Sequence, residues 1–272
     1  MKYALISDIH ANANALQMVI TLCRELQIDR IINLGDTVGY GSRPNECCEM
    51  LAQHAITSIA GNHDLAACGV FEPVYFKPSA RHRMMWTRAV LAATNRSYLA
   101  ALPETQVIDN EFVIVHGSLK SYSQYLLTEK AIQQSFALLK KNYPGFNVCF
   151  FGHTHKALAH ELSATGLRRV EAAEFNLAAD ALYLINPGSI GYPRYQDSPL
   201  SFAIYDSDHK AVRLVRLEER GERAVLQRDM QPDIALDAAL VRQYLLFVAR
   251  AGARFFHNRF LNRRHSGMAG RS

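Results

Sequence analysis

Carboxylate, amide and imidazole side chains gather in five short blocks within the first 155 residues. The blocks are Asp8-Ile9-His10, Gly35-Asp36, Gly61-Asn62-His63-Asp64, His116-Gly117 and Gly152-His153-Thr154-His155. Residues two apart in an extended chain point to the same side, so Asp8 and His10 can face one pocket, as can His153 and His155. Oxygen and nitrogen ligands without a thiolate favour Mn, Fe, Zn, Ni or Co, and a carboxylate such as Asp36 can bridge two cations. The blocks therefore predict a site for transition-metal ions.

Each block taken alone also has an ordinary structural explanation. A single histidine at the end of a strand is usually a hydrogen-bonded structural residue, and Gly61-Asn62-His63 alone is typical of a turn. Five such blocks in one chain, each after a predicted strand, favour ligation over five separate coincidences.

Apolar runs place a strand before each block. Residues 3–7, 31–34, 55–60, 112–115 and 148–151 are predicted strands, and residues 11–26, 44–54 and 128–141 are predicted helices. This alternation predicts a mainly parallel sheet with helices outside it. Open folds of this kind place ligands on loops at the carboxyl ends of their strands, which is where the blocks lie.

The remaining segments change the predicted class. Residues 78–101 show an apolar stripe at helical spacing, which predicts one longer helix packed on the core. Strand-like segments with little helix between them follow at 157–163, 168–174, 181–186, 202–207 and 211–217. Such a run favours antiparallel pairing. We therefore expect an α/β fold grading into α+β, with two sheets packed face to face and helices outside them.

Composition excludes several classes of protein. Of 272 residues, 49% are hydrophobic and only 9 are Pro and 15 Gly, which excludes a disordered or collagenous chain. The five cysteines are odd in number and lack CxxC spacing, so neither a disulfide framework nor a zinc ribbon is expected. The first ten residues already contain Asp8, and no apolar run approaches the roughly 20 residues that cross a bilayer. We expect a soluble cytoplasmic protein.

Positive charge is concentrated at the end of the chain. Residues 238–272 contain seven arginines and no acidic residue, and subtracting these seven charges from the total of +5 leaves −2 for the first 237 residues. We predict a core domain over residues 1–220, with residues 65–110 as a possible cap, and a basic helical extension over 221–272. The amphipathic pattern of 236–262 favours docking on protein or on an anionic surface, and no stable nucleic-acid partner is expected.

The five blocks together resemble the calcineurin-like metallophosphoesterase superfamily. The matching blocks span residues 8–155, and Asn186-Pro187-Gly188-Ser189 and Pro193-Arg194 are similar in style. The strings SDIHANANAL and NLGDTVGYGSRPNEC resemble the small bacterial and archaeal branch that is often labelled diadenosine-tetraphosphatase-related. The resemblance implies a two-sheet sandwich flanked by helices, and a metal-dependent phosphoric ester hydrolase.

The resemblance also implies a role for each matching residue. Asp8, His10, Asp36 and His155 would hold one divalent ion, and Asp36, Asn62, His116 and His153 the other, with Mn the first expectation and Fe, Zn, Ni or Co as alternatives. Hydroxide bridging the two ions would attack phosphorus. His63 would contact phosphate and protonate the leaving group, with Asp64 orienting it. The substrate would be a phosphodiester or phosphoanhydride, such as diadenosine tetraphosphate, or another phosphorylated small molecule.

One position departs from the protein phosphatases of the superfamily. The protein phosphatases and the symmetric diadenosine tetraphosphatases carry GDxxDRG, whereas this chain has Gly39 and Tyr40 in place of the Asp and the Arg. Because the planar guanidinium grips a phosphate dianion, its absence disfavours a protein serine/threonine phosphatase. Arg194 or Lys120 could compensate, with Asn62 as a further phosphate contact. A non-catalytic binding module with this fold is the other alternative, but all seven ligand positions are filled.

Overall fold

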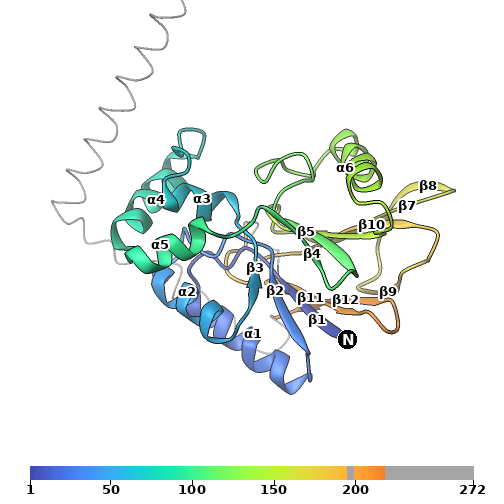
Figure 1. Cartoon of the computed structure of the whole chain (residues 1–272), viewed down its shortest axis with the longest axis horizontal. Helices are drawn as coiled ribbons and strands as arrows, with labels where there is room; N and C mark the ends of the chain where they lie inside the picture. Colours follow the sequence, from blue (N-terminus) through green and yellow to red (C-terminus); the bar gives the residue numbers. More distant parts are fainter. Residues whose placement is uncertain (195–198, 218–272) are drawn as a thin grey trace, which may run out of the picture. The chain divides into compact units, whose positions relative to one another are not determined.

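Two six-stranded β-sheets face each other in the computed structural model of the chain, which describes residues 1–194 and 199–217 (Figure 1). The first sheet contains, in spatial order, β3 (Thr57–Ser58), β2 (Arg30–Asn33), β1 (Lys2–Ile6), β11 (Ser201–Asp206), β12 (Ala211–Arg216) and β9 (Glu174–Asn176). The second contains β4 (Thr105–Ile108), β5 (Phe112–Val115), β6 (Val148–Phe151), β10 (Leu182–Pro187), β7 (Ala157–Ser163) and β8 (Gly166–Val170).

Strand direction follows the same plan in both sheets. The strands β1, β2 and β3 pair in parallel, and so do β5, β6 and β10. The other strand pairs are antiparallel, including β1 with β11 and β10 with β7. The predicted fold class, two sheets packed face to face and flanked by helices, is confirmed, and both sheets are mixed rather than mainly parallel. Each sheet thus presents a set of parallel strand ends from which loops can leave in the same direction.

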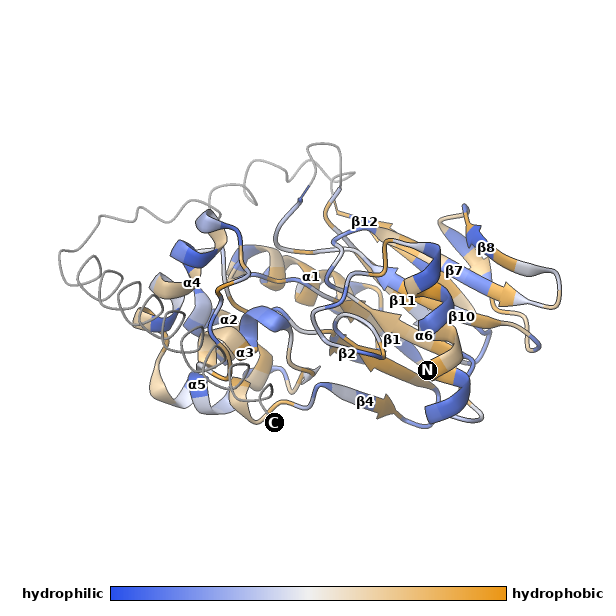
Figure 2. Cartoon of the chain, turned by 90° about the horizontal axis from the view of Figure 1, so that it is seen from above, coloured by the Kyte–Doolittle hydropathy of each residue, from blue (hydrophilic) through white to orange (hydrophobic). Residues whose placement is uncertain are grey.

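Apolar side chains fill the space between the sheets. Along β1, Tyr3 and Leu5 point to this inner core, while Ala4 and Ile6 belong to the core on the outer face of the sheet. The alternation is the period of two of a strand that is buried on both faces. Four aromatic rings meet in the inner core, and the centroids of Tyr3 and Phe112, and of Phe112 and Phe150, are both 5.1 Å apart. Figure 2 shows hydrophobic residues over most of β1, while α6 carries hydrophilic stretches.

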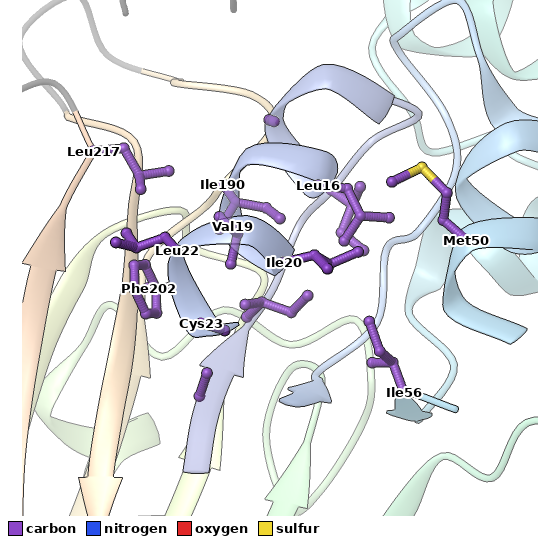
Figure 3. Packing of buried hydrophobic residues seen from close by; sticks show 14 of the residues in the cluster. Leu16, Val19, Ile20, Leu22, Cys23, Met50, Ile56, Ile190, Phe202 and Leu217 are labelled. Atoms are coloured by element: carbon purple, nitrogen blue, oxygen red, sulfur yellow. The ribbon is translucent and has the colours of Figure 1, made fainter. Parts of the chain in front are cut away.

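Six helices of the described residues lie outside the two sheets. The helices are α1 (Ala13–Glu25), α2 (Pro44–Gln53), α3 (Asn62–Cys68), α4 (Pro78–Val90), α5 (Ala93–Ala100) and α6 (Glu129–Asn142). Apolar residues of α1, among them Leu16, Val19 and Cys23, pack with Phe202 and Ile190 of the first sheet and its loops (Figure 3). On the second sheet, Phe136 and Leu139 of α6 are buried in the corresponding outer core. The helix α1 begins where the Asn12 side chain accepts a hydrogen bond from the Ala15 N–H.

The prediction of one helix over 78–101 is wrong. The chain forms α4 and α5 instead, with a break at Leu91 and Ala92. The side chain of Asn45, on α2, accounts for the break: its amide nitrogen donates to the Val90 carbonyl and its oxygen accepts from the Ala92 N–H, each at 2.8 Å. These are backbone groups that a continuous helix would use internally, so a residue on another helix ends α4.

Other boundaries also differ from the predictions. The segment 168–174 is divided between β8 and β9, β4 was not predicted, and the residues after Gly61 form α3 rather than only a turn. The predicted extension over 221–272, with its amphipathic stretch, lies outside the described residues. No helix in the described ranges is both long enough and apolar enough to span a membrane.

Candidate metal centre

The five polar blocks come together at the carboxyl ends of the parallel strands. Asp8 follows β1, Asp36 follows β2, and Asn62 follows β3 at the start of α3. His116 follows β5, and His153 and His155 follow β6. Within the described part of the chain, three groups have ligand atoms that all lie within 4.8 Å of one another: Asp8 with His10 and His155, His10 with Asp36 and His63, and Asp36 with His116 and His153.

Asp8 has one carboxylate oxygen fixed and the other free for a cation. Its Oδ2 accepts hydrogen bonds from the Ser7 hydroxyl at 2.7 Å and from the His153 N–H at 3.0 Å. Its Oδ1 lies 3.0 Å from His155 Nε2 and 3.6 Å from His10 Nε2. The carboxylate is therefore held in one orientation by donors from both sheets, with Oδ1 facing two imidazoles.

The two carboxylate oxygens of Asp36 are divided in the same way, and this residue belongs to two of the three groups. Its Oδ1 accepts from the His63 backbone N–H at 2.8 Å. Its Oδ2 lies 3.2 Å from His116 Nε2 and 3.8 Å from His10 Nε2. Since His10 belongs with Asp8 and His116 with His153, Asp36 Oδ2 lies between two potential ion positions, as a bridging carboxylate must.

Backbone carbonyls orient the imidazoles. Four histidines each have one ring nitrogen at hydrogen-bond distance from a carbonyl oxygen: His10 Nδ1 from Val38, His116 Nδ1 from Leu34, His155 Nδ1 from Tyr192 and His153 Nε2 from Ser123. A carbonyl only accepts, so that nitrogen carries the proton and the other keeps its lone pair. The Nε2 atoms of His10 and His155 then present lone pairs to each other only 3.2 Å apart, which a cation between them would relieve.

Unsatisfied polar atoms are concentrated here. Among the described residues, six buried atoms of this cluster have no hydrogen-bond partner: Asp8 Oδ1, Asp36 Oδ2, Asn62 Oδ1, His63 Nδ1, His116 Nε2 and His153 Nδ1. Each such atom costs about 1–3 kcal/mol, and natural folds contain few of them. Because they are all oxygen or imidazole nitrogen and they converge, divalent cations fit the site.

Backbone strain marks the same residues. Asp8, His10, Asp36, His153 and His155 all have φ between 49° and 66°, the left-handed region that non-glycine residues seldom adopt. Such conformations cost about 1–3 kcal/mol each and persist where surrounding contacts impose them. Five of the seven predicted ligands are therefore held in unfavourable backbone conformations that aim their side chains at one point.

Burial and neighbouring imidazoles act in opposite directions on the two carboxylates. Burial is the largest influence on Asp36 and acts to raise its pKa, but His116 and His63 outweigh it and hold the pKa far below the usual 3.8. The pKa of Asp8 is also held well below its usual value, with His155 the main opponent of burial. Both carboxyl groups are therefore ionised at neutral pH, as metal ligation requires.

Comparison with known proteins now identifies the family. The sequence model of the calcineurin-like phosphoesterase superfamily domain matches residues 1–210. The chain belongs to this superfamily. It is also 32% identical, over 220 residues that cover 79% of this chain and 86% of the relative, to an uncharacterized protein of Methanocaldococcus jannaschii.

Two solved structures share the metallophosphoesterase fold. A metallophosphoesterase from Sphaerobacter thermophilus is 32% identical and superposes with a TM-score of 0.70, covering 89% of this chain and 97% of that one. A hypothetical protein from Pyrococcus horikoshii OT3 is 19% identical, with a TM-score of 0.65, covering 85% of this chain and 94% of that one. The superfamily generally binds divalent metals, in agreement with the clustered ligand atoms.

The metallophosphoesterase residue His63 is buried among rings. Its centroid lies 4.8 Å from that of His10, 4.9 Å from Tyr40 and 4.7 Å from Phe76. Gly39 makes room for it: Gly39 has φ +91°, and a Cβ at this position would lie 2.4 Å from His63 Nδ1. The Gly39 that replaces the Asp of the protein phosphatases is thus a requirement of the observed His63 position.

Asp64 does not contact the ring that we expected it to orient. Its Oδ1 accepts from the Val38 N–H and its Oδ2 from the Gly61 N–H, both at 3.0 Å. Asp64 therefore joins the loop after β2 to the start of α3, acting on the backbone that carries His63. Burial and the nearby charge of Asp36 raise the pKa of Asp64 to about 6.

The two positively charged side chains that were expected to bind phosphate, Arg194 and Lys120, differ in position. Arg194 donates from Nη1 to the Tyr125 hydroxyl at 2.6 Å, and the Tyr125 ring stacks on the ring of His153, so the guanidinium lies beside the cluster. Lys120 is exposed. Its backbone N–H donates a hydrogen bond to the Ser118 hydroxyl, and among the described residues its side chain has no hydrogen bond to a residue of the site. The structure thus brings Arg194, but not the Lys120 side chain, to the site.

Several residues at the site were missed by sequence reasoning. Ser7 and Asn186 are buried and hold Asp8 and the loop of His153, while Tyr125 and Tyr192 contribute rings, with Tyr125 stacked on His153 and Tyr192 on Tyr40. Asn186 lies in the segment Asn186-Pro187-Gly188-Ser189, whose similarity to the superfamily is the signal that could have indicated it. Backbone carbonyls such as that of Ser123 leave no trace in residue identity.

Proposed function

We propose that this protein hydrolyses a phosphodiester or phosphoanhydride bond in a reaction that requires two divalent cations. The observation that carries the proposal is the shared carboxylate. Asp36 Oδ2 faces ligand atoms of two groups, while Oδ1 is fixed by the His63 N–H. A site for a single ion would not need a carboxylate in this position.

The proposed ligand sets are those that the family resemblance implies, and the converging atoms support six of the seven residues, with Asn62 added by the resemblance. Asp8, His10, Asp36 and His155 would hold one ion, and Asp36, Asn62, His116 and His153 the other. Bound divalent ions, with Mn as the first candidate, would supply Lewis acidity towards phosphoryl oxygens and lower the pKa of a water molecule towards 7. The side chains themselves fix the positions, since each of the six aspartates and histidines is held by a backbone or hydroxyl partner.

His63 is proposed as the proton donor to the leaving oxygen. Burial lowers the pKa of His63, so its ring is neutral in the absence of substrate. A bound phosphoryl group would add negative charge beside the ring and favour its protonation. His63 also lies within ligand distance of His10 and Asp36, so its role is separated from ligation by experiment, as described in the Discussion.

The proposed substrate is a nucleotide with an internal phosphate bond, such as a dinucleoside polyphosphate, and Asn62 and Arg194 are the proposed phosphate contacts. Support comes from the sequence resemblance to diadenosine-tetraphosphatase-related proteins and from the ring-lined site around His63 and Tyr40. A protein serine/threonine phosphatase is disfavoured because Gly39 and Tyr40 replace the Asp and the Arg. We further propose that the protein acts in the cytoplasm.

Metal-stripped protein reloaded with Mn²⁺ tests the proposal. We expect hydrolysis of diadenosine tetraphosphate, with separation of the nucleotide products by chromatography. ATP with AMP would indicate attack at an end phosphate, and two ADP would indicate central cleavage. Turnover of bis(4-nitrophenyl) phosphate alone would retain the phosphoesterase and reject the nucleotide. Failure on both substrates by protein that contains its metals would contradict the proposed function and favour a binding module.

A further inference from the structure

Tyr125 lies at the candidate metal centre although no sequence motif includes it. Its ring stacks on the ring of His153, with centroids 3.9 Å apart and planes at 21°. Its hydroxyl accepts the hydrogen bond from Arg194 Nη1 at 2.6 Å, and the guanidinium carbon lies 5.3 Å from the Tyr125 centroid. One side chain therefore contacts both a predicted metal ligand and the predicted phosphate-binding cation.

The loop that carries Tyr125 is fixed by its own hydrogen bonds. The Ser118 hydroxyl donates to the Gln124 side chain at 2.6 Å, and the backbones of Ser118 and Ser121 form two hydrogen bonds, at 2.9 and 3.1 Å. The Ser123 carbonyl lies 3.1 Å from His153 Nε2. Since the loop is tied to itself and to His153, the position of Tyr125 is set before any ligand binds.

Arg194 is held from two directions. Tyr192, two residues earlier, stacks on Tyr40 with centroids 4.2 Å apart and planes at 13°, and its carbonyl is the partner of His155. At the far end of the Arg194 side chain, the guanidinium donates a hydrogen bond to the Tyr125 hydroxyl. The guanidinium has five N–H donors in a planar fork, so the bond to Tyr125 leaves donors that can bind phosphoryl oxygens.

Other arginines near the site are used differently. Arg81 of α4 donates to the Val74 carbonyl at 2.7 Å, and Arg83 donates to the Tyr40 carbonyl, also at 2.7 Å. Arg81 thus holds α4 to the segment before it, and Arg83 holds α4 to the loop after β2. Arg194, by contrast, donates to the hydroxyl of a tyrosine whose ring stacks on His153, so it lies beside the candidate metal centre.

We propose that Tyr125 is a positioning residue that holds Arg194 beside His153, so that the guanidinium binds the phosphoryl group of the substrate. The inference rests on the proposed function and adds to it how the phosphate contact is built where Tyr40 stands in place of arginine. The Tyr125 hydroxyl fixes the orientation of the Arg194 guanidinium by a hydrogen bond, and the Tyr125 ring stabilises its positive charge by a cation–π contact. Tyr125 acts through Arg194, so its effect should vanish when Arg194 is absent.

A double-mutant cycle on phosphate binding tests this dependence. Binding of inorganic phosphate to Mn-loaded protein is measured by isothermal titration calorimetry for the wild type, Tyr125→Phe, Arg194→Ala and the double variant. Arg194→Ala is expected to weaken binding roughly 10- to 100-fold, and Tyr125→Phe roughly 3- to 10-fold, because charge-assisted hydrogen bonds are lost. In the Arg194→Ala background, Tyr125→Phe should have no further effect.

The controls separate positioning from general damage. Tyr125→Phe keeps the ring on His153, so its metal content, measured by mass spectrometry, should equal that of the wild type. Tyr122→Phe changes a tyrosine of the same loop whose ring stacks on Phe71, and phosphate binding should not change. An equal effect of Tyr125→Phe with and without Arg194 would overturn the proposal, and so would undiminished binding by Arg194→Ala or a failure of the wild type to bind phosphate. Phosphate binding without hydrolysis of any ester would contradict the proposed function, while the cycle would still decide the role of Tyr125.

Discussion

The two sheets supply different ligands to the candidate metal centre. Loops after β1, β2 and β3 provide both carboxylates, the amide of Asn62 and one imidazole, whereas loops after β5 and β6 provide three imidazoles. In the first sheet, donors fix the carboxylate oxygens that do not ligate, as Ser7 does for Asp8. In the second sheet, carbonyls fix the ring nitrogens that do not ligate, as Ser123 does for His153.

This difference shows which parts of a metal centre depend on residue identity. A carboxylate needs an N–H or O–H partner, and Ser7 supplies one from its side chain. An imidazole needs an acceptor, and every chain segment carries carbonyl groups. The negative charge of the site therefore comes from the first sheet, while the second sheet adds imidazoles on a backbone framework. Five substitutions test this comparison.

Asp36→Asn should have the largest effect, because it removes charge from the carboxylate that both ion positions share. We expect both ions to be lost or weakened and hydrolysis of bis(4-nitrophenyl) phosphate to fall by about 10³-fold or more. Metal content per chain measures the first effect and steady-state kinetics the second. Asp180→Asn, at an exposed carboxylate away from the site, is the matched control. Full metal content in Asp36→Asn would contradict the bridging role.

His155→Ala and His116→Ala should each remove a ligand from one ion position only. Metal content is expected to fall by about one ion per chain in each variant, with activity reduced roughly 10²- to 10³-fold, less than for Asp36→Asn. His160→Ala, on β7, is the control and should keep both ions. Loss of both ions in either variant would mean that the two positions are not separable and would remove the contrast with Asp36.

His63→Ala should separate the proton donor from the ligands. The variant is expected to retain both ions and to lose roughly 10²-fold in turnover of esters with alkoxide leaving groups. Loss on 4-nitrophenyl esters should be much smaller, because nitrophenolate departs without a proton. The ratio of the two losses, measured on one preparation, is the result of interest. Equal losses on both esters would contradict proton donation, and loss of an ion would place His63 among the ligands.

Ser7→Ala should have the smallest effect of the five. The substitution removes the hydroxyl that donates to Asp8 Oδ2 and leaves the His153 N–H as the other donor. Loss of a hydrogen-bond partner of a metal ligand typically lowers metal affinity by about 10- to 100-fold, and we expect about 10-fold here. Competition with a chelator measures it. Ser135→Ala, at a buried serine of α6, is the control, and equal affinities in the two variants would show that Asp8 needs no side-chain donor.

Residue identity made the cluster of Asp, Asn and His side chains predictable, and periodicity made the sheets predictable. The blocks could be found because Asp, Asn and His carry their chemistry in their side chains, and the parallel strand ends followed from the order of strands and helices. The break between α4 and α5 could not be found locally, because it is imposed by Asn45 on another helix. The role of Asp64 was misjudged because its partners are backbone amides.

Tyr125 shows the same limit at the site itself. The loop 118–125 has no periodic pattern, and its contacts to His153 and Arg194 join segments that are distant in the sequence. Gly39 and Tyr40 could be recognised as a departure from the protein phosphatases, but the reason needed the structure. A side chain at position 39 would collide with His63.

Titration of metal-free protein with Mn²⁺, followed by the rate of bis(4-nitrophenyl) phosphate hydrolysis, tests the central claim most directly. The account predicts negligible hydrolysis without metal and a rate that rises until about two ions are bound per chain, since Asp36 is shared by two ligand sets. Full activity in the metal-free protein, or a rate that reaches its maximum at one ion per chain, would contradict it.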